Sequence, residues 1–246
     1  MQGLKGKTVL VTGGAKRLGA ALAEGIAAAG AHVIIHCRHS RDEAEKLAGI
    51  IIDAGGDASV IESDLADSAM ADSLVGRAIA LAGPIDVLIN NASIFHEDSF
   101  MEMEPESIHK NININAVAPM LIARRFAEQH RKGVIINLLD TMVMDYDKHH
   151  VSYHLSKRML HTLTRIMAVE FAPNIRVNAI APGLILPPPG KDVDYLESLV
   201  HSNPLRKHGN ASDIVDAALY LLRASFVTGQ TLFVDGGRHL RGSMYE

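Results

Sequence analysis

The chain repeats one pattern along its length: a short run of apolar residues, then a longer segment whose apolar residues recur with the period of a helix. Short apolar runs bounded by turn residues predict buried strands, and strands that alternate with helices predict βαβ units with parallel pairing. Because the apolar runs carry few polar residues, we expect helices on both faces of the sheet. The pattern therefore predicts an α/β fold with one doubly wound parallel sheet of about seven strands.

The expected elements alternate along the whole chain. We expect strands at Thr8–Thr12, His32–His36, Ala58–Glu62, Val87–Asn90, Val134–Leu138, Ile175–Ile180 and Thr231–Val234. The expected helices are Lys16–Ala29, Arg41–Asp53, Ser68–Leu81, Pro105–His130 and Val151–Phe171. No internal repeat, low-complexity tract or linker-like break divides the sequence, so residues 1–246 are expected to form a single Rossmann-like domain.

A stretch over residues 184–209 lies outside the expected sheet. It contains Pro187-Pro188-Pro189 and a short helical pattern over Asp192–His201. A segment of this length without a strand is usually either a functional lid or a disordered loop. We expect a substrate lid here, with a disordered loop as the alternative.

Charge and cysteine content weigh against several classes of protein. Lys and Arg number 24 against 28 Asp and Glu, a net charge of −4, so there is no basic field to hold a nucleic-acid backbone. Cys37 is the single cysteine, and the 13 histidines show no convincing ligand spacing, so no metal site is expected. No apolar run approaches the roughly 18 residues of a transmembrane helix, and the N-terminus lacks a signal-peptide core. We expect a cytoplasmic protein without nucleic-acid or membrane partners.

A glycine-containing turn follows the first expected strand and reads Thr12-Gly13-Gly14-Ala15-Lys16-Arg17-Leu18-Gly19. Glycines in such a turn let backbone amides approach a pyrophosphate, whose charge the helix N-terminus favours. The spacing alone is a weak signal, because Arg17 takes the place of the central glycine, but its position in a βαβ unit strengthens it. The turn indicates a dinucleotide cradle, with a tight turn that binds no ligand as the alternative.

The second expected strand ends in His36-Cys37-Arg38-His39-Ser40. A site for NAD places a carboxylate about 20 residues after the glycine turn, where it bonds the ribose 2′-OH. No carboxylate precedes Asp42 here, whereas Arg38 offers a guanidinium that suits a 2′-phosphate, with His39 and Ser40 beside it. This predicts NADPH as the cofactor. Which of the three side chains meets the phosphate stays open, and a solvated basic loop is the alternative.

Tyr153 and Lys157 are four residues apart on an expected helix, so their side chains lie on one face. A phenol has a reference pKa of about 10, which is too high for easy proton transfer near neutrality. A neighbouring ammonium favours the phenolate and lowers the pKa of the phenol. Such pairs are common by chance, but this one follows the fifth expected strand and is a candidate for acid–base chemistry.

Five motifs together resemble the classical short-chain dehydrogenase/reductase family, in its order and spacing over nearly the whole chain. They are Thr12-Gly13 with Gly19, Asn90-Asn91-Ala92, Tyr153 with Lys157, Pro182-Gly183 and Val234-Asp235-Gly236-Gly237. The resemblance implies a homotetramer and, as catalytic residues, Tyr153, Lys157 and Asn115. The cofactor site that it implies comprises Gly13, Arg17, Leu18, Gly19, Arg38, His39, Ser40, Asp64, Leu65, Asn91, Ala92, Ser93, Tyr153, Lys157, Pro182 and Gly183.

Three departures from the family pattern resemble its pteridine reductase branch. Arg17 replaces the central turn glycine, Asp140 replaces the serine usual after the fifth strand, and Phe95 follows the Asn90-Asn91-Ala92-Ser93 motif. In that branch the phenylalanine stacks on a pterin, and residues matching Arg17 and Ser93 contact pterin or phosphate. The order Arg38-His39-Ser40 differs from the branch's His-Arg-Ser. The implied substrate site is Arg17, Ser93, Phe95, Asp140 and Tyr153.

An aspartate beside the tyrosine suits the reduction of a C=N bond. Hydride goes to carbon and a proton goes to the ring nitrogen, and Asp140 can relay that proton with Tyr153 as the donor. A flat aromatic substrate explains Phe95 through offset stacking. The alternatives are a helix N-cap or turn role for Asp140 and ordinary packing for Phe95.

Three hypotheses of function follow. The leading one is an NADPH-dependent reductase that converts a dihydropteridine, dihydrobiopterin-like or dihydromonapterin-like, to the tetrahydro form in tetrahydropterin or folate metabolism. The runner-up is a short-chain carbonyl reductase for another substrate, such as a 3-oxoacyl thioester or a sugar ketone. The third is a cofactor-binding sensor without turnover, against which the presence of Asn115, Tyr153 and Lys157 argues.

Overall fold

Seven parallel strands form one sheet of order β3-β2-β1-β4-β5-β6-β7 in the computed structural model, which describes residues 3–188 and 190–240. The strands are β1 (Thr8–Val11), β2 (His32–Cys37), β3 (Asp57–Glu62), β4 (Val87–Asn90), β5 (Gly133–Leu138), β6 (Ile175–Pro182) and β7 (Thr231–Val234). The predicted α/β fold with a doubly wound parallel sheet is therefore confirmed.

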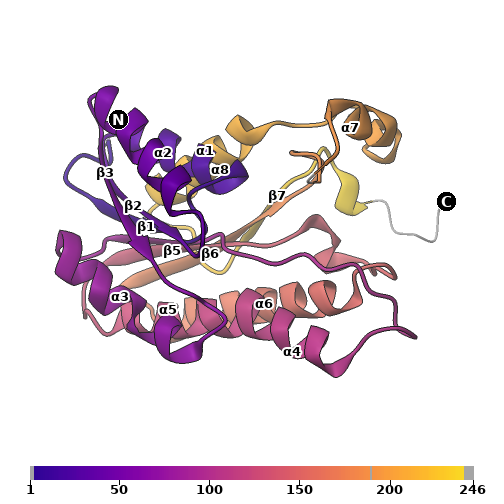
Figure 1. Ribbon diagram of the computed structural model, residues 1–246, viewed down its shortest axis with the longest axis horizontal. Helices are drawn as coiled ribbons and strands as arrows, with labels where there is room; N and C mark the ends of the chain where they lie inside the picture. The colour runs from indigo at the N-terminus through magenta and orange to yellow at the C-terminus, as the bar shows by residue number, and fades with distance from the viewer. Residues whose placement is uncertain (1–2, 189, 241–246) are drawn as a thin grey trace.

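Helices cover both faces of this sheet (Figure 1). Val9 and Val11 of β1 belong to the apolar cluster shared with α1, α2 and α8, whereas Leu10 between them belongs to the cluster shared with α3, α5 and α6. The alternation follows from the pleat, which points successive side chains to opposite faces. The covering helices are α1 (Arg17–Ala28), α2 (Arg41–Asp53) and α8 (Ala211–Arg223) on one face, and α3 (Ser68–Ala82), α5 (Ala118–Ala127) and α6 (Val151–Glu170) on the other.

The helix expected over Pro105–His130 is interrupted by a wider turn. Helix α4 (Pro105–Ile112) passes into a π-helical turn over Asn113–Val117, from which α5 continues. A π turn holds one residue more than the α-helical ladder and is frequent at functional sites. It contains Asn115, which is almost completely buried.

The segment between β6 and α8 contains the short helix α7 (Val193–Leu199), within the helical pattern expected over Asp192–His201. The elements expected above do not include α8, which is a correction. Its sequence signal is a capping box, in which the Asn210 side chain accepts the N–H of Ser212 and Asp213 accepts the N–H of Asn210.

The order of strands reverses between β1 and β4, because chain order runs outward to β3 on one side and to β7 on the other. In doubly wound sheets, ligands bind in the crevice outside the carboxyl ends of the strands at such a point. The turn after β1 and the loop after β4 meet there. Among the described residues, no helix is long and apolar enough to cross a membrane.

Candidate active site

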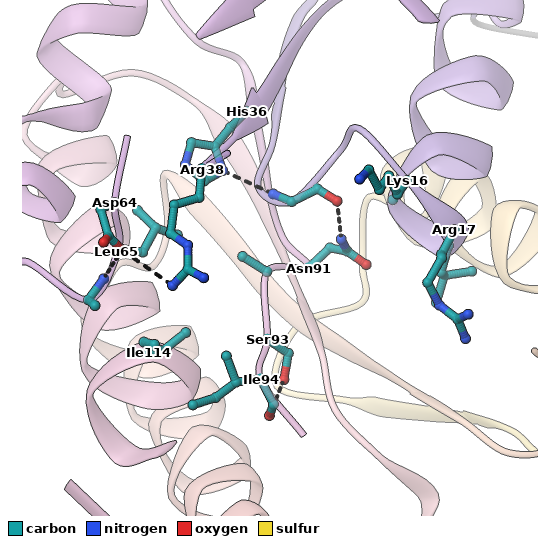
Figure 2. A pocket seen from close by; sticks show the side chains of 15 residues that line it. Lys16, Arg17, His36, Arg38, Asp64, Leu65, Asn91, Ser93, Ile94 and Ile114 are labelled. Carbon is teal, nitrogen blue, oxygen red and sulfur yellow. Dashed lines mark hydrogen bonds and ion pairs between the residues drawn. The ribbon is translucent and has the colours of Figure 1, made fainter. Parts of the chain in front are cut away.

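A cavity of about 400 Å³ opens at the crevice between the ends of β1 and β4 (Figure 2). Its lining is Gly13, Lys16, Arg17, Leu18, Gly19, His36, Arg38, Asp64, Leu65, Ala66, Asn91, Ala92, Ser93, Ile94 and Ile114. Ten of the residues predicted for the cofactor line this cavity, Arg38 among them, whereas His39, Ser40, Tyr153, Lys157, Pro182 and Gly183 do not. Lys16, His36, Ala66, Ile94 and Ile114 are lining residues that the motifs did not indicate.

Partly buried hydrogen bonds fix the glycine turn against the loop after β4. The Thr12 hydroxyl oxygen accepts the backbone N–H groups of Asn91 and Ala92, both at 3.0 Å. In return, Asn91 Nδ2 donates to the carbonyl oxygens of Thr12 at 2.9 Å and Gly13 at 3.0 Å. These reciprocal bonds make the two segments one rigid wall of the cavity.

Two glycines in this wall have no room for a side chain. Gly13 has a φ of +60°, and a Cβ there would lie 2.9 Å from Ala92 Cα. A Cβ on Gly19 would lie 2.7 Å from Asn91 Nδ2 and still closer to the Gly13 carbonyl oxygen. The glycines thus permit the close packing of turn, loop and helix that a pyrophosphate cradle requires.

His36, at the end of β2, links the turn to the end of β3. Its Nδ1 accepts the Gly13 N–H at 3.0 Å, and its Nε2 lies 3.0 Å from the Ser63 carbonyl oxygen (Figure 2). Nδ1 must therefore be the unprotonated nitrogen and Nε2–H the donor to Ser63. Burial lowers the pKa of His36 to about 4, which keeps the ring neutral at physiological pH.

Arg38 and Asp64 form the far end of the cavity. Arg38 Nη1 lies 3.9 Å from Asp64 Oδ1, which also accepts the Ala66 N–H at 2.9 Å. Figure 2 shows Arg38 and Arg17 at opposite sides of the cavity, so the two guanidinium groups do not share one anion. His39 is exposed and does not line the cavity.

Arg17 contacts the segment expected to be the lid. Its Nη2 donates to the Pro187 carbonyl oxygen at 2.6 Å, although its backbone lies in the left-handed region with a φ of +55°. That region suits glycine, the residue that Arg17 replaces. The contact ties the turn to residues 184–188.

Tyr153 and Lys157 lie on α6 beside the loop that follows β5. The Tyr153 hydroxyl donates to Asp140 Oδ2 at 3.2 Å, and Lys157 Nζ lies 5.7 Å from the centre of the Tyr153 ring. Lys157 Nζ also donates to the Leu138 carbonyl oxygen at 2.8 Å, which holds α6 to the end of β5. The structure therefore brings Asp140, Tyr153 and Lys157 together.

Asp140 also caps a helical turn, as one alternative above proposed. Its Oδ1 accepts the Met142 N–H at 2.8 Å, while Oδ2 faces Tyr153. The two roles use different oxygens of the carboxylate and are compatible.

The electrostatics of this group favour a protonated tyrosine. Burial raises the pKa of Tyr153 well above its usual value, and the Asp140 carboxylate raises it further, so this pKa is not lowered as predicted from Lys157. Burial also raises the pKa of Asp140. Burial lowers the pKa of Lys157 to about 8, which Asp140 partly opposes, so its ammonium stays charged near neutrality.

Asn115 is the centre of a buried network built by the π turn. Its Oδ1 accepts from Ser93 Oγ at 3.1 Å and from the Ile94 N–H at 2.9 Å, and its Nδ2 donates to Ser156 Oγ at 3.0 Å. The network joins the loop after β4 to α6, one residue from Lys157. In this arrangement Asn115 supports the loop after β4 and helix α6, and it does not contact Asp140, Tyr153 or Lys157 through any of these bonds.

Phe95 lies at the mouth of the site and is 56% exposed, which excludes the alternative of core packing. Its ring stacks on His150, with centroids 4.1 Å apart, and meets the Tyr153 ring at 88° with centroids 4.7 Å apart. His150 Nδ1 lies 2.9 Å from Asp147 Oδ2. One face of Phe95 is therefore covered by a histidine that the sequence motifs did not indicate.

The residues present fit a dinucleotide cofactor. The glycine turn lets the backbone approach a pyrophosphate, and the bond from Asn91 to Gly13 holds that turn in place. Arg38 supplies positive charge in the same cavity. Pro182 and Gly183 lie at the end of β6, where a Cβ on Gly183 would lie 2.6 Å from Asp235 Cα. Among the described residues, no group of three or more His, Cys, Asp or Glu could hold a metal ion.

Comparison with known proteins agrees with this geometry. Residues 13–239 match the family model described as enoyl-(acyl carrier protein) reductase. The chain is 35% identical to 3beta-hydroxysteroid dehydrogenase 1 of Eggerthella lenta, covering 96% of this chain and 95% of the relative. It is 32% identical to L-xylulose reductase of Bos taurus, covering 95% and 97%.

A solved structure is similar over nearly the whole chain. FolM alternative dihydrofolate reductase 1 from Brucella canis, complexed with NADP, is 35% identical with a TM-score of 0.92, covering 98% of this chain and 97% of that one. The bound NADP of that protein agrees with the prediction of NADPH from Arg38. With the matched motifs and the sheet topology, these likenesses place the chain in the short-chain dehydrogenase/reductase family of oxidoreductases.

Proposed function

We propose that this protein is an NADPH-dependent reductase of dihydropteridines. The observation that carries the proposal is the hydrogen bond between the Tyr153 hydroxyl and Asp140 Oδ2. A ketone substrate needs only a neutral donor beside the tyrosine, whereas a carboxyl that gains and loses a proton suits reduction of a C=N bond. The likeness to an alternative dihydrofolate reductase supports the same substrate class.

NADPH, when bound, supplies the hydride. The turn from Gly13 to Gly19 would hold its pyrophosphate, and Asp64 and Leu65 would line its adenosine end. Arg38 is the residue we assign to the 2′-phosphate, because it lines the cavity and carries a charge that Asp64, at 3.9 Å, only partly offsets. His39 and Ser40 do not line the cavity and take no part in this assignment.

Tyr153 holds the proton that the substrate nitrogen takes. Burial and the neighbouring carboxylate keep this phenol protonated near neutral pH, which is the state that a reductive step requires. After Tyr153 has donated, the Asp140 carboxylate takes up a proton from solvent and passes it to the Tyr153 phenolate across the same hydrogen bond. Lys157 stabilises the short-lived phenolate with its buried ammonium.

The remaining predicted residues form the substrate end. Phe95 would stack on the flat ring beside Tyr153, and Ser93 would present its hydroxyl from the same loop. Arg17 would close the pocket through its bond to Pro187. Residues 184–209 would then act as the substrate lid.

A short-chain carbonyl reductase is the second candidate, and the stack of His150 on Phe95 favours it. If His150 keeps this place, one face of Phe95 is closed to a pterin ring. A ketone of the kind that a steroid dehydrogenase or a sugar reductase handles needs no such face.

The test measures NADPH oxidation by the purified protein with dihydrobiopterin, dihydromonapterin and dihydrofolate, and with a 3-oxoacyl thioester and a sugar ketone in parallel. Turnover of a pterin that falls by about 10²- to 10⁴-fold in Tyr153→Phe supports the proposal. Asp140→Ser is the sharper variant, because it restores the usual family residue. Loss of pterin turnover there is expected, and better ketone turnover with intact pterin turnover would contradict the proposal.

Two further outcomes also contradict it. Turnover of a ketone alone would assign the protein to the second candidate. Tight NADPH binding without turnover of any substrate would make it a cofactor-binding sensor.

The assembly is a separate proposal, drawn from family resemblance. On α6, Ile166 is 55% exposed and Val169 is 81% exposed, on a face without partner in the described part of the chain. A homotetramer would cover such surfaces. Sedimentation of the purified protein as a monomer would refute it.

A further inference from the structure

The helix that carries Tyr153 begins without a cap of its own. The residue before its first turn is His150, whose side chain makes no capping hydrogen bond. The first backbone N–H groups of any helix have no partner inside the helix. Because Tyr153 lies in this first turn, the groups that bind these amides determine where its hydroxyl points.

Asp98, from the loop after β4, supplies the missing acceptors. Its Oδ1 accepts the Ser152 N–H at 3.0 Å, and its backbone carbonyl oxygen accepts the Val151 N–H at 3.3 Å. Its own N–H donates to the His149 carbonyl oxygen at 2.9 Å, so the loop and the start of α6 pair as a short parallel bridge.

The second carboxylate oxygen of Asp98 reaches a third element. Ser107 Oγ of α4 donates to Oδ2 at 3.0 Å. Burial raises the pKa of Asp98, but the hydrogen bonds from Ser152, Ser107 and Val151 outweigh it and hold the pKa below its usual value. Asp98 is therefore an anion whose oxygens both bind protein donors.

The same loop also carries the substrate-side residues. Ile94 is bonded to Asn115 at one end of a short span and Asp98 to α6 at the other, and Phe95 between them meets the Tyr153 ring. We propose that Asp98 is a positioning residue for Tyr153: it caps α6 from outside the helix and fixes the distance between Phe95 and the Tyr153 hydroxyl. The turnover part of this inference rests on the proposed function, but the capping part does not.

Three variants separate positioning from a loss of charge or of fold. Asp98→Ala removes both acceptor oxygens. Asp98→Asn keeps one oxygen for the Ser152 N–H, removes the charge, and replaces the oxygen that faces Ser107 by an NH2 group. Glu97→Ala is the matched control, because Glu97 is an exposed carboxylate next to Asp98 in the same loop.

Hydrogen exchange measured by mass spectrometry on wild type and variants, without substrate, tests the cap. Amides of the peptide over 151–157 are expected to exchange at least about tenfold faster in Asp98→Ala and near the wild-type rate in Asp98→Asn and Glu97→Ala. Equal protection in Asp98→Ala and wild type would overturn the inference, whatever the enzyme reduces.

Turnover then tests positioning, with any substrate that the wild type reduces. Small misplacements of a reacting group cost up to about 10²-fold in rate. In Asp98→Ala, kcat is expected to fall 10- to 100-fold with KM and the NADPH dissociation constant within about threefold, and Asp98→Asn is expected to restore most of kcat. A cap that serves stability alone would lower the melting temperature and leave kcat unchanged, which would contradict the positioning role.

Discussion

At the cofactor end of the site, side chains at the ends of β1, β2 and β4 hold one another through partly buried hydrogen bonds. At the substrate end, by contrast, exposed side chains from separate loops meet. Thr12, Asn91 and His36 leave little freedom in the first region. In the second region Phe95 stacks on His150, and Arg17 donates to the Pro187 carbonyl oxygen. The comparison teaches that the proposed cofactor site is rigid, whereas other side chains partly fill the proposed substrate site beside it.

The largest effect is expected where the rigid end is overfilled. Gly19→Ala places a methyl group against Asn91 Nδ2 and the Gly13 carbonyl oxygen. Overpacking typically costs about 1–3 kcal/mol, and here it would displace the turn that would hold the pyrophosphate of NADPH. NADPH affinity is therefore expected to fall by about 10- to 100-fold in fluorescence titrations.

The matched control is Gly49→Ala on α2, where no atom lies within 4 Å of an added Cβ. It is expected to leave affinity unchanged and to stabilise the helix by about 0.5–1 kcal/mol. Unchanged NADPH affinity in Gly19→Ala would show that the turn around Gly13 and Asn91 can move to accommodate a methyl group, which would contradict its rigidity.

The pH dependence of stability tests His36, and its sign is fixed by the lowered pKa. The native state holds His36 neutral down to about pH 4, whereas the unfolded chain binds the proton near pH 6.5. Stability is therefore complete above pH 6.5 and is lost as the pH falls from there towards 4. Between pH 7 and 5 the loss from this group is about 2 kcal/mol.

In His36→Gln that loss should disappear from denaturant unfolding curves at the two pH values. An equal drop in stability for variant and wild type would mean that the fold does not lower the pKa of His36, which would contradict the role given to its bond with Gly13.

A smaller effect is expected at Arg17, where the two ends of the site meet. Arg17→Gly relieves the left-handed backbone and should stabilise the protein by about 1 kcal/mol or less. It also removes the bond to Pro187, so protease should cleave residues 184–209 faster. Arg17→Lys, which keeps the strain and a donor, is the comparison. Slower or equal cleavage in Arg17→Gly would contradict the inference that the bond from Arg17 to Pro187 holds this segment in place.

An effect of similar size is expected at His150. Removing its ring in His150→Ala frees one face of Phe95, and stacked aromatic pairs are worth about 0.5–1.5 kcal/mol. The KM for a dihydropteridine is expected to fall by about twofold to tenfold, with NADPH affinity unchanged. A rise in KM would instead make His150 a substrate contact.

The sequence predicted what depends on short spans of chain. The strands, the glycine turn and the Tyr153–Lys157 pair are local patterns, and the structure has each of them close to its expected place. Helix α8 could also have been predicted from the sequence, since Asn210 and Asp213 have the spacing of a capping box.

Other features depend on pairing that no local pattern encodes. His36 acts only because β2 and β3 align in a register that brings Ser63 beside it. The stack of Phe95 on His150 and the cap that Asp98 gives α6 join residues more than fifty positions apart. The substrate end is built mostly from such contacts, and for that reason the sequence described it less completely.

Because of the π turn over Asn113–Val117, the structure of this region depends on the exact number of residues between α4 and α5. Each residue of an α-helix turns the chain by about 100°, so the extra residue of the turn rotates everything before it relative to α5. Deleting a single residue within Asn113–Val117 would let α4 and α5 join as one regular helix and would swing Asn115 away from Ser93, Ile94 and Ser156. Substitutions at the outward positions of this turn should therefore be tolerated far better than the shortest possible deletion.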